Sequence, residues 1–195
     1  MTRTSYQLKK DGNEVNLQKH LGLQEVNLNA GWTPAIVGNK IDLDISVLTV
    51  DKNDKGIECV FYQNLVGENS SIVHSGDDRG GDDEGEGPSG IDESIHIKLP
   101  ELKPEVKTIL LVINSYSGHV FEKIIEAFVS VSNPMEDDKE LMYYDLDAEF
   151  GSSSTLVIGK VTRNEDNTWS FQAIGQEIES FEKLLMAYQI PFTAN

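Results

Sequence analysis

Residues that hold soft metals or form crosslinks are scarce in this chain of 195 residues. Cys59 is the only cysteine, so no internal disulfide can form, which suits a reducing compartment. Cys59 falls within a predicted strand, where we expect it to pack rather than to act as a nucleophile. The histidines lack zinc-ligand spacing and are expected at the surface or at strand edges: His20, His74, His96 and His119.

Catalytic and targeting motifs are also lacking. The sequence contains no Gly-rich phosphate loop, no GxSxG motif and no locally supported Cys–His pattern. Met1 is not followed by the apolar region of a signal peptide, and no segment reads as a transmembrane span. We therefore expect a protein that is not an enzyme and that resides in the cytoplasm.

Basic residues are few, with 16 Lys and Arg against 33 Asp and Glu, and the net charge is −17. Such an acidic chain repels nucleic acid and anionic membranes, and it suits divalent cations. The charge is uneven, because eight acids and one base, Arg79, give residues 76–93 a local charge of −7. This acidic loop is the first candidate for a binding site.

Short alternating segments with turn signals between them dominate the rest of the chain. They predict one domain over residues 1–195, mainly all-β, with an antiparallel β-sandwich as its architecture. The loop 76–93 is expected to be flexible, because its glycines and acids cannot bury apolar surface. The predicted strands are 25–30, 42–50, 57–63, 94–99, 108–114, 127–132, 141–146, 155–162 and 168–173.

Two segments have helical character. Residues 120–126 are short and ambiguous. Residues 176–188 place apolar side chains on one stripe, which predicts a helix packed on the sandwich, and Pro191 follows its end. The stripe consists of Ile178, Phe181, Leu184, Leu185 and Tyr188.

The acidic loop has two interpretations. Calcium takes six to eight oxygen ligands, and dense carboxylates favour its uptake, so the loop suits a calcium site. Acidic, Gly-rich segments also occur as solvated loops without a ligand. Composition alone leaves both open.

Asp42 and Asp44 favour the metal interpretation. They lie two residues apart in a predicted strand, so both side chains leave the same face, while Leu43 and Ile45 face the core. A shared cation would offset their repulsion. The alternative is a polar solvent face, which is the norm in antiparallel sheets.

Residues 51–56 read DKNDKG and resemble the start of an EF-hand loop. The pattern fails at its fifth position, Lys55, and at its twelfth, Tyr62, where a bidentate glutamate is required. We predict a hairpin turn there.

Several runs together resemble the TerD-like family of tellurite-resistance stress proteins, in order and over nearly the whole chain. Residues 73–79, VHSGDDR, resemble the family's histidine–glycine–aspartate motif most strongly. The other runs are 13–17 (NEVNL), 28–32 (LNAGW), 41–46 (IDLDIS), 60–65 (VFYQNL), 144–146 (YDL), 169–176 (WSFQAIGQ) and 184–188.

This resemblance implies a β-sandwich that binds two neighbouring calcium ions at one end. The family's acidic positions fall on Asp42, Asp44, Asp77, Asp78, Asp92 and Glu93. The chain departs from the pattern over residues 80–90, GGDDEGEGPSG, which is longer than in the family. The resemblance therefore does not decide which of these acids are ligands: Asp82, Asp83, Glu84 and Glu86. Residues 114–119, NSYSGH, also lack the acid that the family carries there.

The resemblance implies a calcium-dependent binding or scaffold module with protein partners in a stress-response complex. A C2-like module that docks to anionic membrane through calcium is the alternative, for which only Ile91 and Arg79 flank the loop suitably. Direct chemistry on tellurium is not expected, because no thiolate cluster is present.

Overall fold

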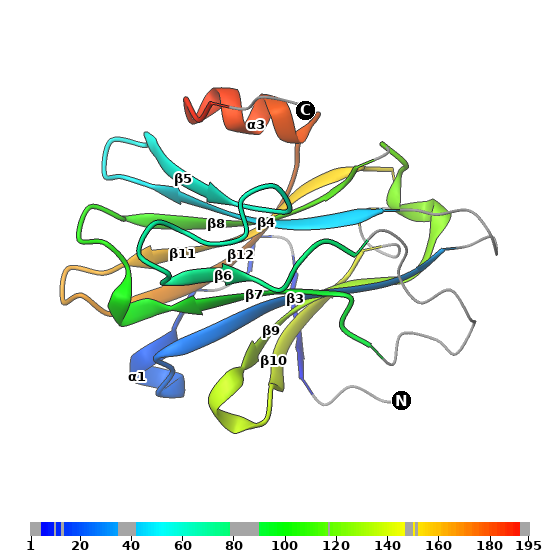
Figure 1. Cartoon of the computed structure of the whole chain (residues 1–195). Coiled ribbons are helices and arrows are strands. Elements are labelled where there is room, and N and C mark those ends of the chain that lie inside the picture. The colour runs from blue at the N-terminus through cyan, green and yellow to red at the C-terminus, as the bar shows by residue number, and fades with distance from the viewer. Residues whose placement is uncertain are drawn as a thin grey trace.

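Two six-stranded sheets pack face to face in the computed structural model (Figure 1). The structure describes residues 5–9, 11–12, 14–34, 42–78, 90–116, 118–146, 150 and 152–191. All strand pairs within the two sheets are antiparallel except β1 with β10. The predicted antiparallel β-sandwich is therefore confirmed.

Sheet A has the strand order β1-β10-β9-β3-β7-β6. Its strands are β1 (Tyr6–Gln7), β10 (Lys139–Asp145), β9 (Ile124–Asn133), β3 (Glu25–Pro34), β7 (Glu93–Lys98) and β6 (Ile72–His74). Sheet B has the order β2-β12-β11-β8-β4-β5. Its strands are β2 (Glu14–Asn16), β12 (Trp169–Glu177), β11 (Thr155–Arg163), β8 (Thr108–Ser115), β4 (Leu43–Val50) and β5 (Gly56–Val60).

The core between the sheets follows from the alternation of the strands. Leu43, Ile45 and Val47 of β4 are fully buried in it, as the sequence pattern predicts. Trp32 and Trp169 are among its largest buried side chains. Each such aromatic side chain removes a large apolar area from water, so the sandwich is held mainly by this shared core.

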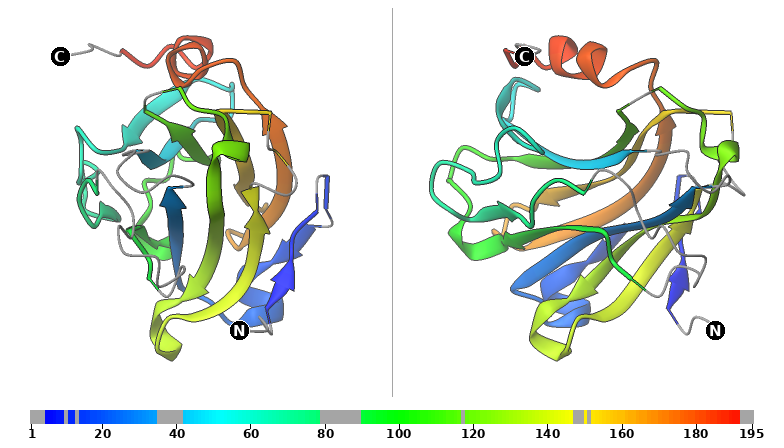
Figure 2. Two further views of the ribbon diagram at one scale, coloured as in Figure 1. Left: turned by 90° about the vertical axis from the view of Figure 1, so that its right-hand side faces the viewer. Right: turned by 45° about the vertical axis from the view of Figure 1, so that its right-hand side comes forward.

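Helix α3 (Phe181–Ala187) covers the outer face of sheet B (Figure 2). Ser180 caps it by accepting the N–H of Lys183. Phe181, Leu184 and Leu185 pack on outward-facing side chains of the sheet, and Ile178 and Tyr188 pack at the margin. The predicted helix and its stripe are confirmed, although residues 176–177 belong to β12. The sheet side chains beneath the helix are Leu48, Val50, Cys59, Leu110, Val112 and Val157.

Other short elements connect the strands. Helix α1 (Leu17–Leu21) is capped by Asn16 and ends at Gly22, whose positive φ of 69° suits glycine. Three 3₁₀ turns are η1 (Leu99–Glu101), η2 (Phe121–Lys123) and η3 (Pro134–Glu136). None of the helices in the described part of the chain has the length and apolar character needed to cross a membrane.

Several predicted boundaries were wrong. Residues 120–126 are no α-helix, because only η2 is helical and β9 begins at Ile124. Strand β3 continues to Pro34, and β5 ends at Val60 rather than at residue 63. The sequence reading also missed β1, β2, β6 and α1, which are too short to show a period.

The turn at residues 51–56 is a hairpin turn, as predicted. It joins the antiparallel strands β4 and β5, and Asp51 accepts the N–H groups of Asn53 and Lys55. These hydrogen bonds lower the pKa of Asp51. The side chain of Asp51 thus stabilises its own turn.

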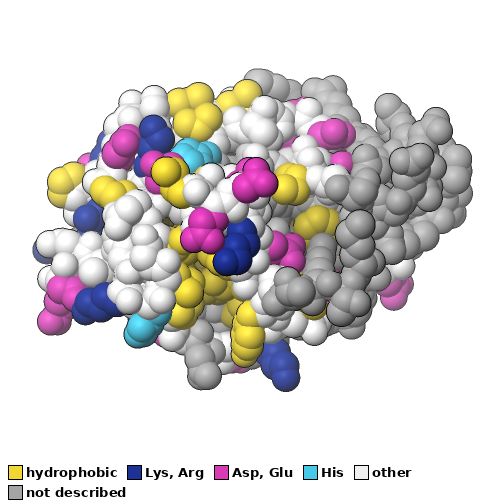
Figure 3. Space-filling model, turned by 90° about the horizontal axis from the view of Figure 1, so that it is seen from below, with side chains coloured by type: hydrophobic (Ala, Val, Ile, Leu, Met, Phe, Trp, Pro, Cys, Tyr) yellow, Lys and Arg dark blue, Asp and Glu magenta, His cyan; other side chains and the backbone are white. Residues whose placement is uncertain are grey.

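Charge is mixed on the face that Figure 3 shows. Acidic and basic side chains are interspersed among the described residues there, and apolar side chains gather near the middle. The described side chains on this face therefore form no single acidic patch.

Candidate metal centre

The site lies at the start of strand β4, on the edge that strand β5 does not reach. Strand β5 pairs with β4 only from Val47 onward, so the edge before Val47 lacks a partner in β5. Glu93 of β7 fills part of this gap, because its Oε2 accepts the N–H of Ile45 at 3.0 Å. A residue of sheet A thereby satisfies an edge group of sheet B.

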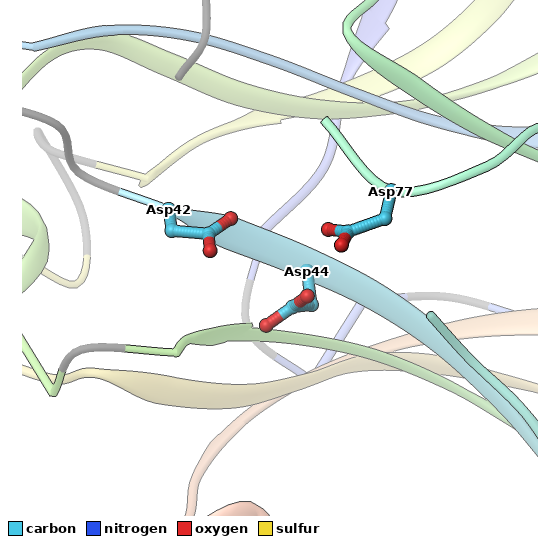
Figure 4. Close-up of side chains that lie close together, drawn as sticks. All are labelled: Asp42, Asp44 and Asp77. Carbon is cyan, nitrogen blue, oxygen red and sulfur yellow. The ribbon is translucent and has the colours of Figure 1, made fainter. Parts of the chain in front are cut away.

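Three carboxylates converge at this edge (Figure 4). Asp42 and Asp44 come from the start of β4, and Asp77 comes from the segment after β6. One oxygen of each lies within 4.8 Å of the others. Asp44 is only 1% exposed, Asp42 is half-buried and Asp77 is exposed. The cluster is therefore buried at Asp44 and open to solvent at Asp77.

The charged form of Asp44 is destabilised in this position. Burial raises the pKa of Asp44 to about 8, and the charges of Asp42, Glu93 and Asp77 add to the effect. The amide of Asn114 opposes the rise by donating to Asp44 Oδ2 at 3.1 Å. The sequence also allowed Asp44 to lie on a polar, solvent-exposed strand face. Its burial excludes that interpretation.

Glu93 connects three segments around the cluster. Besides Ile45, it accepts the N–H of Asp78 at 3.2 Å, which holds the segment carrying Asp77 beside β4. Its Oε2 lies 3.6 Å from His74 Nε2, and both side chains are fully buried. His74 Nδ1 accepts the N–H of Gly76 at 3.0 Å, so Nε2 is the ring nitrogen that faces Glu93.

His74 is buried, so the prediction is wrong where it places this residue at the surface, although His74 does lie in β6, the edge strand of sheet A. Cys59 is buried beneath α3, as expected for a packing residue, and burial raises the pKa of its thiol to about 12.

The remaining predicted ligands are placed as follows. Asp92 lies beside β3, where its Oδ2 accepts the N–H of Trp32 at 2.8 Å. Asp78 is exposed next to Asp77, and Glu93 is the first residue of β7 and not part of the acidic loop. Four predicted or candidate ligands lie outside the described residues: Asp82, Asp83, Glu84 and Glu86.

Two buried neutral oxygens on the strands that carry Asp44 and its partner were not predicted. Asn114 is the cross-strand partner of Asp44, and its Oδ1 is buried with no hydrogen-bond partner among the described residues. Ser46, on the same face of β4, has an Oγ in the same condition. Asp42, Asp44 and Asp77 offer carboxylate oxygens and Asn114 offers an amide oxygen, and oxygen donors are what a hard cation such as calcium requires. The residues present therefore fit such an ion.

Aromatic side chains border the cluster. Tyr62 and Tyr116 meet edge to face with centroids 5.6 Å apart, and Tyr116 donates its N–H to the carbonyl of Asp42 at 2.9 Å. Burial raises the pKa of Tyr62 to about 12, and Tyr116 and the charges of Asp44 and Asp77 contribute. Tyr62 thus lies close enough to respond to charge in the cluster.

The chain is an antiparallel β-sandwich with a cluster of three carboxylates at the start of β4. The chain belongs to the TerD domain family, whose model matches residues 5–188. The resemblance drawn from the sequence is thereby confirmed, and this is a family of tellurium-resistance and general stress proteins.

Two relatives illustrate the family. The chain is 32% identical to general stress protein 16U of Bacillus subtilis, over 84% of this chain and 86% of that protein. It is 30% identical to the tellurium resistance protein TerD of Serratia marcescens, over 88% and 90% respectively.

Solved structures share the fold. A homologue of the telluride resistance protein TerD from Streptomyces coelicolor, SCO6318, has a TM-score of 0.71 with 19% identity, covering 85% of this chain and 98% of that one. A protein of unknown function, SAV2460, has a TM-score of 0.72 with 18% identity, covering 86% and 97%. At these identities the likeness shows the fold alone.

Proposed function

We propose that this protein binds calcium through Asp42, Asp44 and Asp77 and acts as a calcium-dependent binding or scaffold module in a stress response. The observation that carries the proposal is the buried position of Asp44 among three other acids, Asp42, Asp77 and Glu93. Carboxylates so placed repel one another, and a cation held between them removes that repulsion. When bound, the ion supplies positive charge and a fixed junction between β4 and the segment after β6.

Calcium suits the site better than magnesium or zinc. It accepts many oxygen ligands in variable geometry, whereas magnesium demands near-octahedral ligands and releases its water reluctantly. Zinc prefers nitrogen and sulfur ligands, and the donors grouped at the described site are carboxylates. A second ion, implied by the family resemblance, would draw on Asp78, Asp92 and the acidic residues between Arg79 and Gly90.

The proposed role is binding rather than catalysis or direct handling of tellurium. The names of the relatives associate them with tellurium resistance and general stress. The one thiol of this chain, Cys59, is buried and has a raised pKa, so it is a poor ligand or nucleophile. The module would instead signal calcium occupancy to partner proteins in the cytoplasm.

The decisive experiment is a calorimetric titration of calcium into chelator-treated protein, with Asp44→Asn and Glu105→Gln as matched variants. Both variants lose one negative charge, but Glu105 is exposed in the connection that precedes β8, at the end opposite Asn114. A direct ligand supplies an oxygen at bonding distance, so Asp44→Asn should weaken calcium binding by roughly a hundredfold, while Glu105→Gln changes it little. Equal affinities would mean that the chain only gathers counterions.

One observation favours a second candidate, C2-like docking to membranes. Tyr116 is 60% exposed beside the cluster, and Ile91 is exposed just before β7. Co-sedimentation with phosphatidylserine vesicles, with and without calcium, separates the two functions. Calcium-dependent pelleting that is lost in Tyr116→Ala would favour membrane docking over protein scaffolding.

A further inference from the structure

The side chain of Asn114 has one end engaged and the other unused. It is 6% exposed and lies opposite Asp44 in the pairing of β4 with β8. Its Nδ2 donates to Asp44 Oδ2 at 3.1 Å, whereas its Oδ1 is buried with no hydrogen-bond partner among the described residues. A carbonyl oxygen in that condition has lost water without compensation, so it is uncommon in folded proteins and calls for an explanation.

We propose that the amide oxygen of Asn114 is a ligand of the cation, the neutral donor that completes the carboxylate cluster. The inference rests on the proposed calcium site. Amide oxygens are normal calcium ligands beside carboxylates. With the ion bound, both ends of the amide would be used, because Nδ2 holds Asp44 in place while Oδ1 faces the ion.

A neutral ligand suits this position better than a fourth carboxylate close to Asp44. Asp42, Asp44 and Asp77 already bring one carboxylate oxygen each within 4.8 Å of one another. Another acid on β8 would add repulsion in the metal-free protein, whereas an amide adds an oxygen without charge. Residues 114–119 contain no acid, and Asn114 is the first of them.

The competing explanation is that Asn114 only orients Asp44 through Nδ2. Asn114→Asp distinguishes the two roles, because aspartate keeps an oxygen ligand and loses the N–H donor. Asn133 provides the matched control: it is also 6% exposed, but it lies at the opposite end of sheet A, where it caps η3 by accepting the N–H of Met135.

The test combines calcium titration with terbium luminescence on the intact chain. Terbium is a calcium surrogate, and its lifetimes in light and heavy water count the water molecules bound to it. Asn114→Ala should weaken calcium binding by roughly tenfold or more and admit about one additional water to terbium. Asn114→Asp should keep or strengthen calcium binding while it lowers the melting temperature of the metal-free protein. Asn133→Ala and Asn133→Asp should change neither affinity nor hydration.

Each outcome decides between the roles. If Asn114→Asp binds calcium as weakly as Asn114→Ala, and terbium hydration is unchanged in both, the amide is only a hydrogen-bond donor and the inference is overturned. If wild-type protein binds calcium and Asn114→Ala binds it equally well, the inference fails and the proposed function stands. If wild-type protein does not bind calcium at all, the proposed function fails, and the inference with it.

Discussion

Asp44 combines a charged group with nearly complete burial, and this sets how the metal-free protein responds to pH. Its ordinary pKa is about 4, and in the folded chain burial and neighbouring acids raise this pKa to about 8. The folded state therefore binds a proton that the unfolded state releases between these two values. Stability must fall as pH rises through this window, because the unfolded state has already released a proton that the folded state still holds.

The prediction is that calcium-free protein melts at a lower temperature at pH 8 than at pH 5.5, and that Asp44→Asn shows a clearly smaller decrease. Groups far from Asp44 contribute equally in both proteins, so the difference between them reports Asp44 and the acids coupled to it. Thermal melts followed by circular dichroism measure it. Identical pH dependences would show that Asp44 is not protonated in the folded, metal-free chain.

Some residues of the candidate site can be predicted from the sequence, and others cannot. The spacing of Asp42 and Asp44 is visible because two acids on one strand face stand out. Asn114 carries no charge and gives no such signal. Only the register of β4 with β8 places it opposite Asp44, and register is a tertiary property.

At the scale of elements, helix α3 shows how far local pattern determines packing. Its stripe is predicted from helical spacing, and the same side chains contact sheet B. The missed strands, β1, β2 and β6, contain two or three residues each, so their pairing partners rather than their own sequence define them. Residues 120–126 have helical character in the sequence, but Ile124 and Ile125 are β-branched, which favours a strand, and β9 begins at Ile124.

A pair of variants on α3 tests its contribution to stability. Leu185 is buried against sheet B, and Met186 is 73% exposed one residue later. Leu185→Ala should lower the free energy of unfolding by about 2–4 kcal/mol, since it leaves a cavity. Met186→Ala should change it by less than about 0.5 kcal/mol. Urea denaturation measures both values.

The same variants should change access to Cys59, which lies beneath α3. A thiol reagent at pH 8 should label Cys59 faster in Leu185→Ala than in wild-type protein or in Met186→Ala, because the thiol reacts only when the helix opens. Equal labelling rates would mean that α3 does not control this part of the core.

At the scale of the whole molecule, the net charge of −17 makes ion binding and general screening easy to confuse. Calcium that binds only the folded state at a hundred times its Kd stabilises by about 2.7 kcal/mol, which raises the Tm by roughly 5–10 °C for a chain of this size. Magnesium at the same concentration should do much less. Differential scanning calorimetry at constant ionic strength, set with sodium chloride, measures the specific part.

An equal rise with magnesium would contradict the site as described, and no rise with either ion would contradict the calcium proposal.

The bridge that Glu93 makes between the sheets has a kinetic consequence. Asp77 is held beside β4 because Glu93, on sheet A, accepts N–H groups from both Ile45 and Asp78. This arrangement requires that the two sheets have already packed, so the site is complete only late on the folding route. An interaction absent from the transition state slows unfolding and leaves folding nearly unchanged. In a chevron plot, calcium should therefore lower the unfolding arm and leave the refolding arm in place, so that the ion lengthens the lifetime of the native protein without guiding its formation.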